Sequence, residues 1–338
     1  MMAAVWHGGK DIRIEDVPKP RAGRGEALIR VKAVGICGSE LHAYEGLSKR
    51  RVPPLVMGHE FAGVVEEIGE GPARIAIGDR VAVNPLVHCA VCGQCLSGRI
   101  DICPARRHVG VDFPGAFAEY VQVPSRVCYE IPDSVSFQDA TLAEPLSIAT
   151  HAASVANVRD GDAVLILGSG VVGLSCLIAA REKARMILVT DLVDSRLNFA
   201  GLLGADTVIN ASTVDPVSEV QRITSGKGVD VAIEAVGLEK TVSQAISSVN
   251  DAGRVILVGM LDETAVVNIL RITLKQIHVI GSYGRTEPDF VRALTLLETG
   301  LSTVRRLITH TFPLEHISQA FETMSKEKQS AMKIVVLP

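Results

Sequence analysis

Two short clusters of side chains in the first 60 residues have the types and spacing of a metal site. Cys37, Ser39 and His42 lie close together after an apolar run at 27–36, and the pair His59-Glu60 follows further along. Thiolate, imidazole and carboxylate are usual zinc ligands, and a zinc with three protein ligands keeps its fourth position open for water or substrate. We therefore expect Cys37 and His59 to hold a catalytic zinc, with Glu60 adjacent.

A second cluster consists of four cysteines with C-x2-C-x2-C-x7-C spacing, namely Cys89, Cys92, Cys95 and Cys103. Four thiolates can surround one zinc tetrahedrally at about 2.3 Å, and such a closed site is structural. Disulfides are disfavoured by the reducing compartment that the cysteine usage suggests. An iron–sulfur cluster also uses four cysteines, so spacing alone leaves it open. The cluster predicts a metal-stiffened lobe that performs no chemistry.

A glycine-rich loop at 168–173 matches the pattern G-x-G-x-x-G. It follows an apolar run at 163–167 and opens a helix-like segment, which is the context in which such glycines let a pyrophosphate approach a helix N-terminus. Asp191 ends the next strand, where a carboxylate accepts ribose hydroxyls and repels a 2′-phosphate. We therefore expect NAD rather than NADP. The residues assigned to the cofactor are Gly168, Gly170, Val171, Val172, Gly173, Asp191 and Arg196.

Length and composition bound the class of protein. A chain of 338 residues favours two domains. The net charge of −4 argues against a nucleic-acid surface, because phosphate binding relies on clustered Lys and Arg. No apolar run reaches the roughly 18 residues that a membrane-spanning helix needs, and the N-terminus does not have the pattern of a signal peptide. Together with the cysteine usage, these features predict a cytoplasmic protein.

The order of strand-like and helix-like runs predicts an α/β fold with two parts. Residues 1–131 contain many short strand-like runs and no long helix, which is typical of a small barrel or sandwich. An Ala-rich helix is expected at 137–158, with a break at Pro145 because proline removes a backbone donor. Strands then alternate with helices, which predicts a parallel, doubly wound sheet. The expected strands are 163–167, 186–190, 207–209, 229–233, 255–258 and 277–280.

In their order along the chain, these motifs resemble the zinc-dependent medium-chain alcohol and polyol dehydrogenases, including those similar to sorbitol and threonine dehydrogenases. The resemblance implies a GroES-like catalytic domain formed by 1–150 and 285–338, and an inserted Rossmann domain at 151–284 with a six-stranded sheet. The active site would lie in the cleft between them. Two zincs per chain and a homodimer or homotetramer are also implied.

The resemblance also assigns roles to single residues. Glu144, in the segment Leu142–Leu146, resembles the polyol dehydrogenase glutamate that reaches the zinc directly or through water. The implied ligand set is Cys37, His59 and Glu144, with Glu60 adjacent and able to exchange with water or Glu144. Ser39 would take the hydroxyl proton and His42 would relay it to solvent. The family usually has Asp at the position of Glu40, which therefore receives no assigned role. Alternative roles remain open for three residues: a helix-start carboxylate for Glu144, a capping hydroxyl for Ser39 and a structural imidazole for His42.

The resulting functional hypothesis is oxidation of a secondary hydroxyl of a polyol, sugar alcohol or vicinal diol to a ketone. L-threonine 3-dehydrogenase and 2,3-butanediol dehydrogenase activities are the alternatives. Tyr283 and Arg285 are candidates for contact with a hydroxyl-rich or anionic substrate. Two rival classes make different predictions about metal. A non-enzymatic zinc module would need only the cysteine lobe, and a zinc-free quinone or enoyl reductase would need neither metal cluster.

Overall fold

The computed structural model describes residues 1–48, 50–327 and 329–338, and it divides the chain into two compact units. The first unit consists of Met1–Glu144 and Arg285–Pro338, and the second of Pro145–Gly284. The boundary expected at 150/151 falls inside helix α4 (Ala143–Val155), which carries the chain from the first unit into the second.

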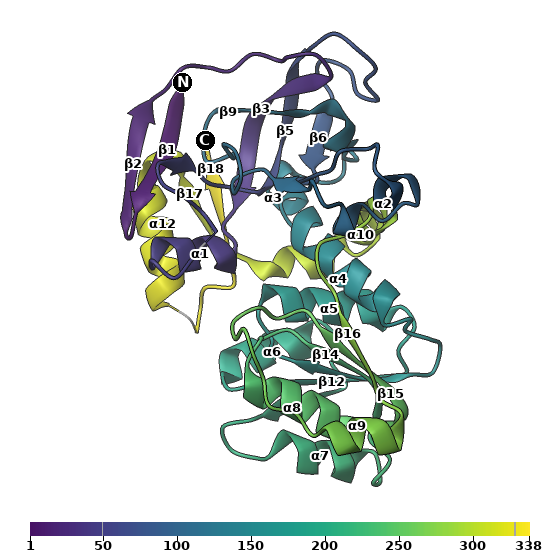
Figure 1. The fold of residues 1–338 in the computed structure, drawn as a ribbon. Coiled ribbons are helices and arrows are strands. Elements are labelled where there is room, and N and C mark those ends of the chain that lie inside the picture. The colour runs from purple at the N-terminus through teal and green to yellow at the C-terminus, as the bar shows by residue number, and fades with distance from the viewer. Residues whose placement is uncertain (49, 328) are drawn as a thin grey trace. The chain divides into compact units, whose positions relative to one another are not determined.

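The first unit is built on a seven-stranded sheet whose main path runs β10-β6-β5-β3-β18-β17, with β9 also paired to β3 (Figure 1). The C-terminal strands β17 and β18 join this sheet, and β18 pairs antiparallel with β3. The last strands of the chain therefore join a sheet whose other strands come from residues 26–130. The strands are β3 (Glu26–Gly35), β5 (Glu60–Ile68), β6 (Arg80–Val83), β9 (Tyr120–Pro124), β10 (Cys128–Glu130), β17 (Ile308–Pro313) and β18 (Lys333–Leu337).

Smaller elements surround this sheet in the first unit. A three-stranded sheet has the order β2-β1-β4, and β7 pairs with β8. The core between them contains Phe61, Phe117 and Phe321, which are all almost completely buried. The strands are β1 (Met2–Gly8), β2 (Asp11–Asp16), β4 (Leu55–Val56), β7 (Leu86–Val87) and β8 (Arg107–His108). The helices are α1 (Gly38–Tyr44), α2 (Gly93–Leu96), α3 (Phe137–Ala140), α10 (Glu287–Thr299), α11 (Leu301–Val304) and α12 (Ile317–Lys326).

The second unit contains one six-stranded sheet of order β13-β12-β11-β14-β15-β16, in which every neighbouring pair is parallel. All five side chains of β11 are buried, as expected for a parallel strand covered on both faces. The predicted doubly wound sheet is thus confirmed. Its strands are β11 (Ala163–Leu167), β12 (Met186–Asp191), β13 (Thr207–Asn210), β14 (Val229–Glu234), β15 (Val249–Leu257) and β16 (His278–Gly281), and its helices are α5 (Val171–Arg181), α6 (Asp194–Leu202), α7 (Pro216–Ile223), α8 (Glu239–Ser248) and α9 (Ile269–Lys275).

The expected helix at 137–158 differs from the observed elements. The interruption lies between α3 and α4, before the proline, and not at Pro145 itself. Pro145 is the third residue of α4. In the first turn of a helix a backbone N–H has no intrahelical partner, so the missing donor costs little. The helix therefore continues through the proline to Val155.

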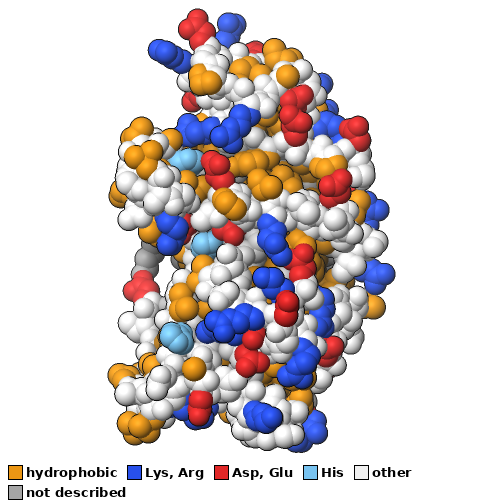
Figure 2. Space-filling view, turned by 90° about the vertical axis from the view of Figure 1, so that its right-hand side faces the viewer, with side chains coloured by type: hydrophobic (Ala, Val, Ile, Leu, Met, Phe, Trp, Pro, Cys, Tyr) orange, Lys and Arg blue, Asp and Glu red, His pale blue; other side chains and the backbone are white. Residues whose placement is uncertain are grey.

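The described residues contain no helix with the length and apolar character that crossing a bilayer requires. On the face seen in Figure 2, acidic and basic side chains alternate without forming a broad area of one sign. That face thus lacks the clustered cations typical of a nucleic-acid surface.

Candidate active site

The pairing of β3 with β5 brings the two halves of the expected metal site together. Gly35, the last residue of β3, stands opposite Glu60, the first residue of β5, in antiparallel register. Cys37 lies two residues beyond the end of β3, and His59 directly precedes β5. Residues distant in sequence therefore meet at one end of a strand pair.

Cys37, His59 and Glu60 form a group able to hold a metal ion. Each offers one ligand atom, and these atoms lie within 4.8 Å of one another. His59 and Glu60 are buried and Cys37 is half-buried. A sulfur, a nitrogen and an oxygen donor at this spacing fit zinc, which accepts all three.

Glu40, which has no assigned role from sequence, organises this group from one side. Its Oε1 accepts hydrogen bonds from His59 Nδ1 at 2.8 Å and from the Gly58 N–H at 2.8 Å. Its Oε2 accepts from the Cys37 N–H at 2.9 Å. Burial alone would lower the pKa of His59, but the charges of Glu40 and Cys37 outweigh burial and raise that pKa. With Nδ1 held by Glu40, Nε2 is the nitrogen left for a metal.

Two buried carboxylates at the site are each paired with a buried cation. Glu60 accepts a hydrogen bond from Lys333 Nζ, which also donates to the Ile36 carbonyl at 3.1 Å. Glu144 accepts from Arg285 Nη2. Glu144 is not a member of the three-residue group that includes Glu60. The carboxylate whose ligand atom lies with those of Cys37 and His59 is thus Glu60.

Ser39 and His42 follow Cys37 on helix α1. Ser39 Oγ donates to Cys37 Sγ at 3.4 Å and accepts from Arg51 Nη2 at 3.2 Å. Arg51 also donates to the Ser39 carbonyl at 2.9 Å and is only 7% exposed. His42 lies three residues beyond Ser39 and is half-buried. The serine hydroxyl is therefore held beside the Cys37 sulfur by a buried guanidinium.

The cysteine cluster has the dimensions of a tetrahedral metal site. Four Sγ–Sγ distances among Cys89, Cys92, Cys95 and Cys103 are 3.5, 3.6, 3.8 and 3.9 Å, and none of these cysteines forms a disulfide. Four sulfurs at about 2.3 Å from one zinc would stand about 3.8 Å apart. Without an ion, backbone N–H groups of Val91 and Cys92 lower the pKa of Cys89 to about 6, whereas burial and the neighbouring thiols raise the pKa of Cys95 to about 12.

In the second unit, the glycine loop joins β11 to α5 with very little space between them. A Cβ on Gly173 would lie 1.9 Å from the Gly168 carbonyl oxygen, so only glycine permits this approach. A Cβ on Gly170 would meet nothing within 4 Å. Gly170 is the N-cap of α5 and no side chain caps that helix. The helix N-terminus is thus left open, which fits a pyrophosphate.

Asp191 lies directly against this loop. Its Oδ2 accepts from the Ser169 N–H at 2.7 Å, and its Oδ1 accepts from the N–H groups of Leu192 and Val193 at 2.8 and 3.0 Å. Arg196 lies in the first turn of α6, and its side chain is half-buried. Its Nε is shielded from solvent and has no hydrogen-bond partner among the described residues. Val171 and Val172 open α5 and are half-buried.

Three cations at the metal group were not predicted, or were predicted in another role. Arg285 is only 2% exposed and donates to Glu144 and to Asn84 Oδ1, so it is tied to the protein itself. Lys333 is a single charge in the apolar run of β18, a signal that could have identified it. Arg51 follows other basic residues, and its sequence context gives no comparable signal. Tyr283, beyond β16, is half-buried.

Two family models match the chain. The model described as alcohol dehydrogenase GroES-like domain matches residues 23–133, and the model described as zinc-binding dehydrogenase matches residues 170–299. Among curated proteins, the sorbitol dehydrogenase of Bacillus subtilis is 36% identical over 100% of this chain and 97% of its own length. The L-idonate 5-dehydrogenase of Vitis vinifera is 36% identical over 96% and 92%.

Solved structures agree over the whole chain. A 2R,3R-butanediol dehydrogenase from Bacillus subtilis has a TM-score of 0.91 with 32% identity, covering 100% of this chain and 99% of that one. An alcohol dehydrogenase from E. coli CFT073, solved in complex with NADH, has a TM-score of 0.94 with 30% identity and the same coverage.

Proposed function

The chain belongs to the zinc-dependent medium-chain alcohol and polyol dehydrogenases, and on that premise we propose the reaction and the residues that perform it. The proposed reaction oxidises a secondary hydroxyl of a polyol, sugar alcohol or vicinal diol to a ketone, with NAD as the hydride acceptor. The observation that carries the proposal is the convergence of the ligand atoms of Cys37, His59 and Glu60 within 4.8 Å.

We assign the catalytic zinc to Cys37 and His59, with Glu60 or Glu144 as the third ligand. Bound there, zinc would supply a Lewis acid that lowers the pKa of a substrate hydroxyl and polarises a ketone in the reverse direction. One thiolate and one carboxylate would offset the charge of the ion, so the occupied site would be nearly neutral. A second, structural zinc is assigned to the cysteines at 89, 92, 95 and 103.

The chain's own residues would move the proton. Ser39 Oγ stands beside Cys37 Sγ and can accept the proton of a hydroxyl held at the metal. Arg51 donates to the same oxygen and, being permanently charged, favours negative charge on it. His42, one turn along α1, would pass the proton to solvent. This relay needs no group from outside the first unit.

The preference for NAD rests on Asp191. Three backbone N–H groups fix its carboxylate at the end of β12, beside the glycine loop. In that place a carboxylate accepts hydrogen bonds from ribose hydroxyls and repels a 2′-phosphate. Gly168, Gly170 and Gly173, with Val171 and Val172 at the start of α5, would cradle the pyrophosphate. Arg196 would reach the adenosine end.

The substrate alternatives are 2,3-butanediol and L-threonine. Full-length similarity to a butanediol dehydrogenase favours the first of these as a second candidate. Both molecules carry a secondary hydroxyl next to another polar group, so the same metal, serine and histidine would serve them. The reacting group is therefore a secondary hydroxyl in each candidate, and the candidates differ in the rest of the molecule.

One assay and one metal analysis test the proposal together. Purified protein is offered sorbitol, other polyols, L-idonate, the butanediols and L-threonine with NAD or NADP, and reduced nicotinamide is followed by absorbance. We expect NAD-dependent turnover of at least one of these alcohols and two zincs per chain. One zinc would indicate a structural module, and zinc-free protein would indicate a reductase of the same fold.

We also propose that the protein is cytoplasmic and forms a homodimer or homotetramer. The cytoplasmic assignment is supported by its cysteines, none of which forms a disulfide. The assembly is supported by β16, which stands at the end of the sheet path next to β15 and so presents an edge.

A further inference from the structure

Glu234 is a buried carboxylate at the nucleotide edge of the second unit's sheet. It is the last residue of β14 and stands beside Leu167, the last residue of β11, in parallel register. Its side chain is completely buried. Because the glycine loop begins directly after Leu167, Glu234 lies next to the segment proposed to bind the nucleotide.

One oxygen of this carboxylate gathers three donors. Glu234 Oε1 accepts from the N–H groups of Val236 and Gly237 at 2.9 and 2.8 Å and from Thr241 Oγ1 at 2.7 Å. Thr241 Oγ1 also lies 2.9 Å from the Leu238 carbonyl oxygen, which shares its hydrogen. The Glu234 main-chain carbonyl accepts from the N–H groups of Val258 and Gly259 at 2.9 and 3.0 Å. A single residue thus ties together the turn after β14, helix α8 and the loop after β15.

That turn presses directly against the glycine loop. Gly168 has φ +96°, and a Cβ placed on it would lie 2.6 Å from Val236 Cγ2. On its other side, the turn after β14 contacts the loop after β15. A Cβ on Gly259 would lie 2.1 Å from the Gly237 nitrogen, so the backbones of this turn and this loop are in contact. A shift of the turn would therefore move the wall of the nucleotide loop.

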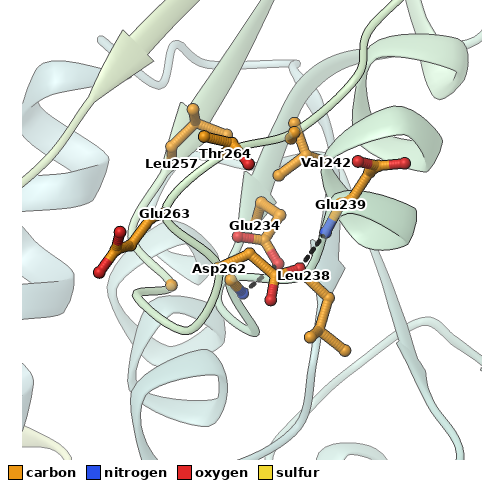
Figure 3. A pocket seen from close by; sticks show the side chains of 11 residues that line it. Glu234, Leu238, Glu239, Val242, Leu257, Asp262, Glu263 and Thr264 are labelled. Atoms are coloured by element: carbon orange, nitrogen blue, oxygen red, sulfur yellow. Dashed lines mark hydrogen bonds between the residues drawn. The ribbon is translucent and has the colours of Figure 1, made fainter. Parts of the chain in front are cut away.

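The other oxygen of Glu234 has no comparable role. Glu234 lines a pocket of about 200 Å³ together with three more acidic residues, Glu239, Asp262 and Glu263, and no basic side chain belongs to the lining (Figure 3). Within the described part of the chain, Glu234 Oε2 is buried and accepts no hydrogen bond. The structural connections of the side chain therefore pass through Oε1 alone.

We propose that Glu234 is a positioning residue for the dinucleotide, acting through Oε1 on the turn that packs against Gly168. The inference rests on the proposed NAD-dependent function, but it concerns a residue that touches neither zinc nor substrate. Loss of Oε1 would leave the Val236 and Gly237 N–H groups without their acceptor and release the turn, whereas Thr241 Oγ1 could still donate to the Leu238 carbonyl. Nucleotide affinity would fall, while the metal group and the proton relay, which lie in the first unit, would keep their geometry.

The experiment compares Glu234→Ala with Glu234→Gln in the full-length protein. The amide keeps an oxygen where Oε1 stands and places its nitrogen at Oε2, so Glu234→Gln should bind NADH within about twofold of wild type. Glu234→Ala should weaken NADH binding about tenfold or more, because the turn that packs against Gly168 loses the acceptor of its backbone N–H groups. Binding is measured by NADH fluorescence, and KM for NAD should rise while kcat stays within about threefold.

The matched control is Asp230→Ala on the same strand. Asp230 accepts from the Ala163 N–H at 2.8 Å and from Asn250 Nδ2 at 2.7 Å, but it lies near the opposite end of β14. The Asp230→Ala variant should have a lower melting temperature than wild type and an unchanged affinity for NADH. If Glu234→Ala does not fold, Thr241→Val removes one of the three donors and should weaken binding by about twofold to fivefold.

Two results would overturn the positioning role. One is wild-type NADH affinity in the folded Glu234→Ala or Thr241→Val variant. The other is Glu234→Gln as weak as Glu234→Ala, which would assign the effect to the charge and not to Oε1. Failure of the proposed function is a separate result, because it would appear as absence of NADH binding by the wild-type protein.

Discussion

At the scale of single residues, the metal group depends on side chains that do not themselves offer a ligand to it. Glu40 fixes the His59 ring through Nδ1 and fixes the backbone of Cys37 and Gly58. Arg51 fixes the hydroxyl of Ser39 in the same way. Each of these residues is buried, so its hydrogen bonds compete little with water.

Glu40→Ala should therefore damage the metal site without removing a ligand. Residues that orient a metal-binding histidine typically contribute about 10- to 100-fold in metal affinity or activity. We expect zinc content to fall toward one per chain after dialysis against a weak chelator, with the cysteine lobe still loaded. Glu45→Ala is the control, since Glu45 accepts from Ser325 Oγ instead. Two retained zincs and full turnover would contradict the role of Glu40.

The proposed relay makes a different prediction for His42. His42→Ala should reduce turnover by about 10²–10⁴, the usual contribution of a general acid or base, while zinc content stays at the wild-type value. Added imidazole should restore part of the rate, because it can carry the proton in place of the side chain. His316→Ala, which changes an exposed histidine, serves as the control. Unchanged turnover would reject the relay.

At the scale of elements, two glycines of the loop at 168–173 serve different purposes: one allows tight packing of a helix, and the other leaves space for the nucleotide. Gly173 permits close packing of α5 on the end of β11, whereas Gly170 leaves open space at the helix N-terminus. The same substitution at these two positions should therefore have different consequences.

Gly173→Ala should destabilise the protein, because its Cβ would overlap the Gly168 carbonyl. Overpacking of this kind costs about 1–3 kcal/mol, which is measurable as a lower melting temperature. Gly170→Ala should leave the melting temperature near that of wild type but weaken NADH binding about tenfold, since its methyl group projects where the pyrophosphate approaches. Equal melting temperatures for both variants, or unchanged NADH affinity for Gly170→Ala, would contradict this division.

At the scale of the whole molecule, the sequence predicted what neighbouring residues encode and missed what distant segments create. The glycine loop and the four-cysteine cluster depend on local spacing, and the parallel sheet on the alternation of strands and helices along the chain. Cys37 and His59 could be proposed together only from their residue types, because the β3–β5 pairing is what brings them together. The pairs Glu60–Lys333 and Glu144–Arg285 join residues from opposite ends of the first unit, so no local pattern indicates them. Glu234 illustrates the same limit, since its role depends on loops that only the folded sheet brings together.

The proposed assembly makes the last prediction. Strand β16 lies at the edge of the second unit's sheet, and side chains of α9 nearby in sequence are strongly exposed, with Ile269 70%, Leu270 66% and Leu274 73% accessible. An open edge strand with exposed apolar side chains is a template for pairing with a second copy.

We expect light scattering to give a multiple of the 36.0 kDa chain mass. The double substitution Leu270→Glu and Leu274→Glu should reduce that mass, because it places charge on an apolar contact. Leu202→Glu on α6, also exposed, should leave it unchanged. A monomeric wild type, or an unaltered mass in the double variant, would exclude α9 from the interface.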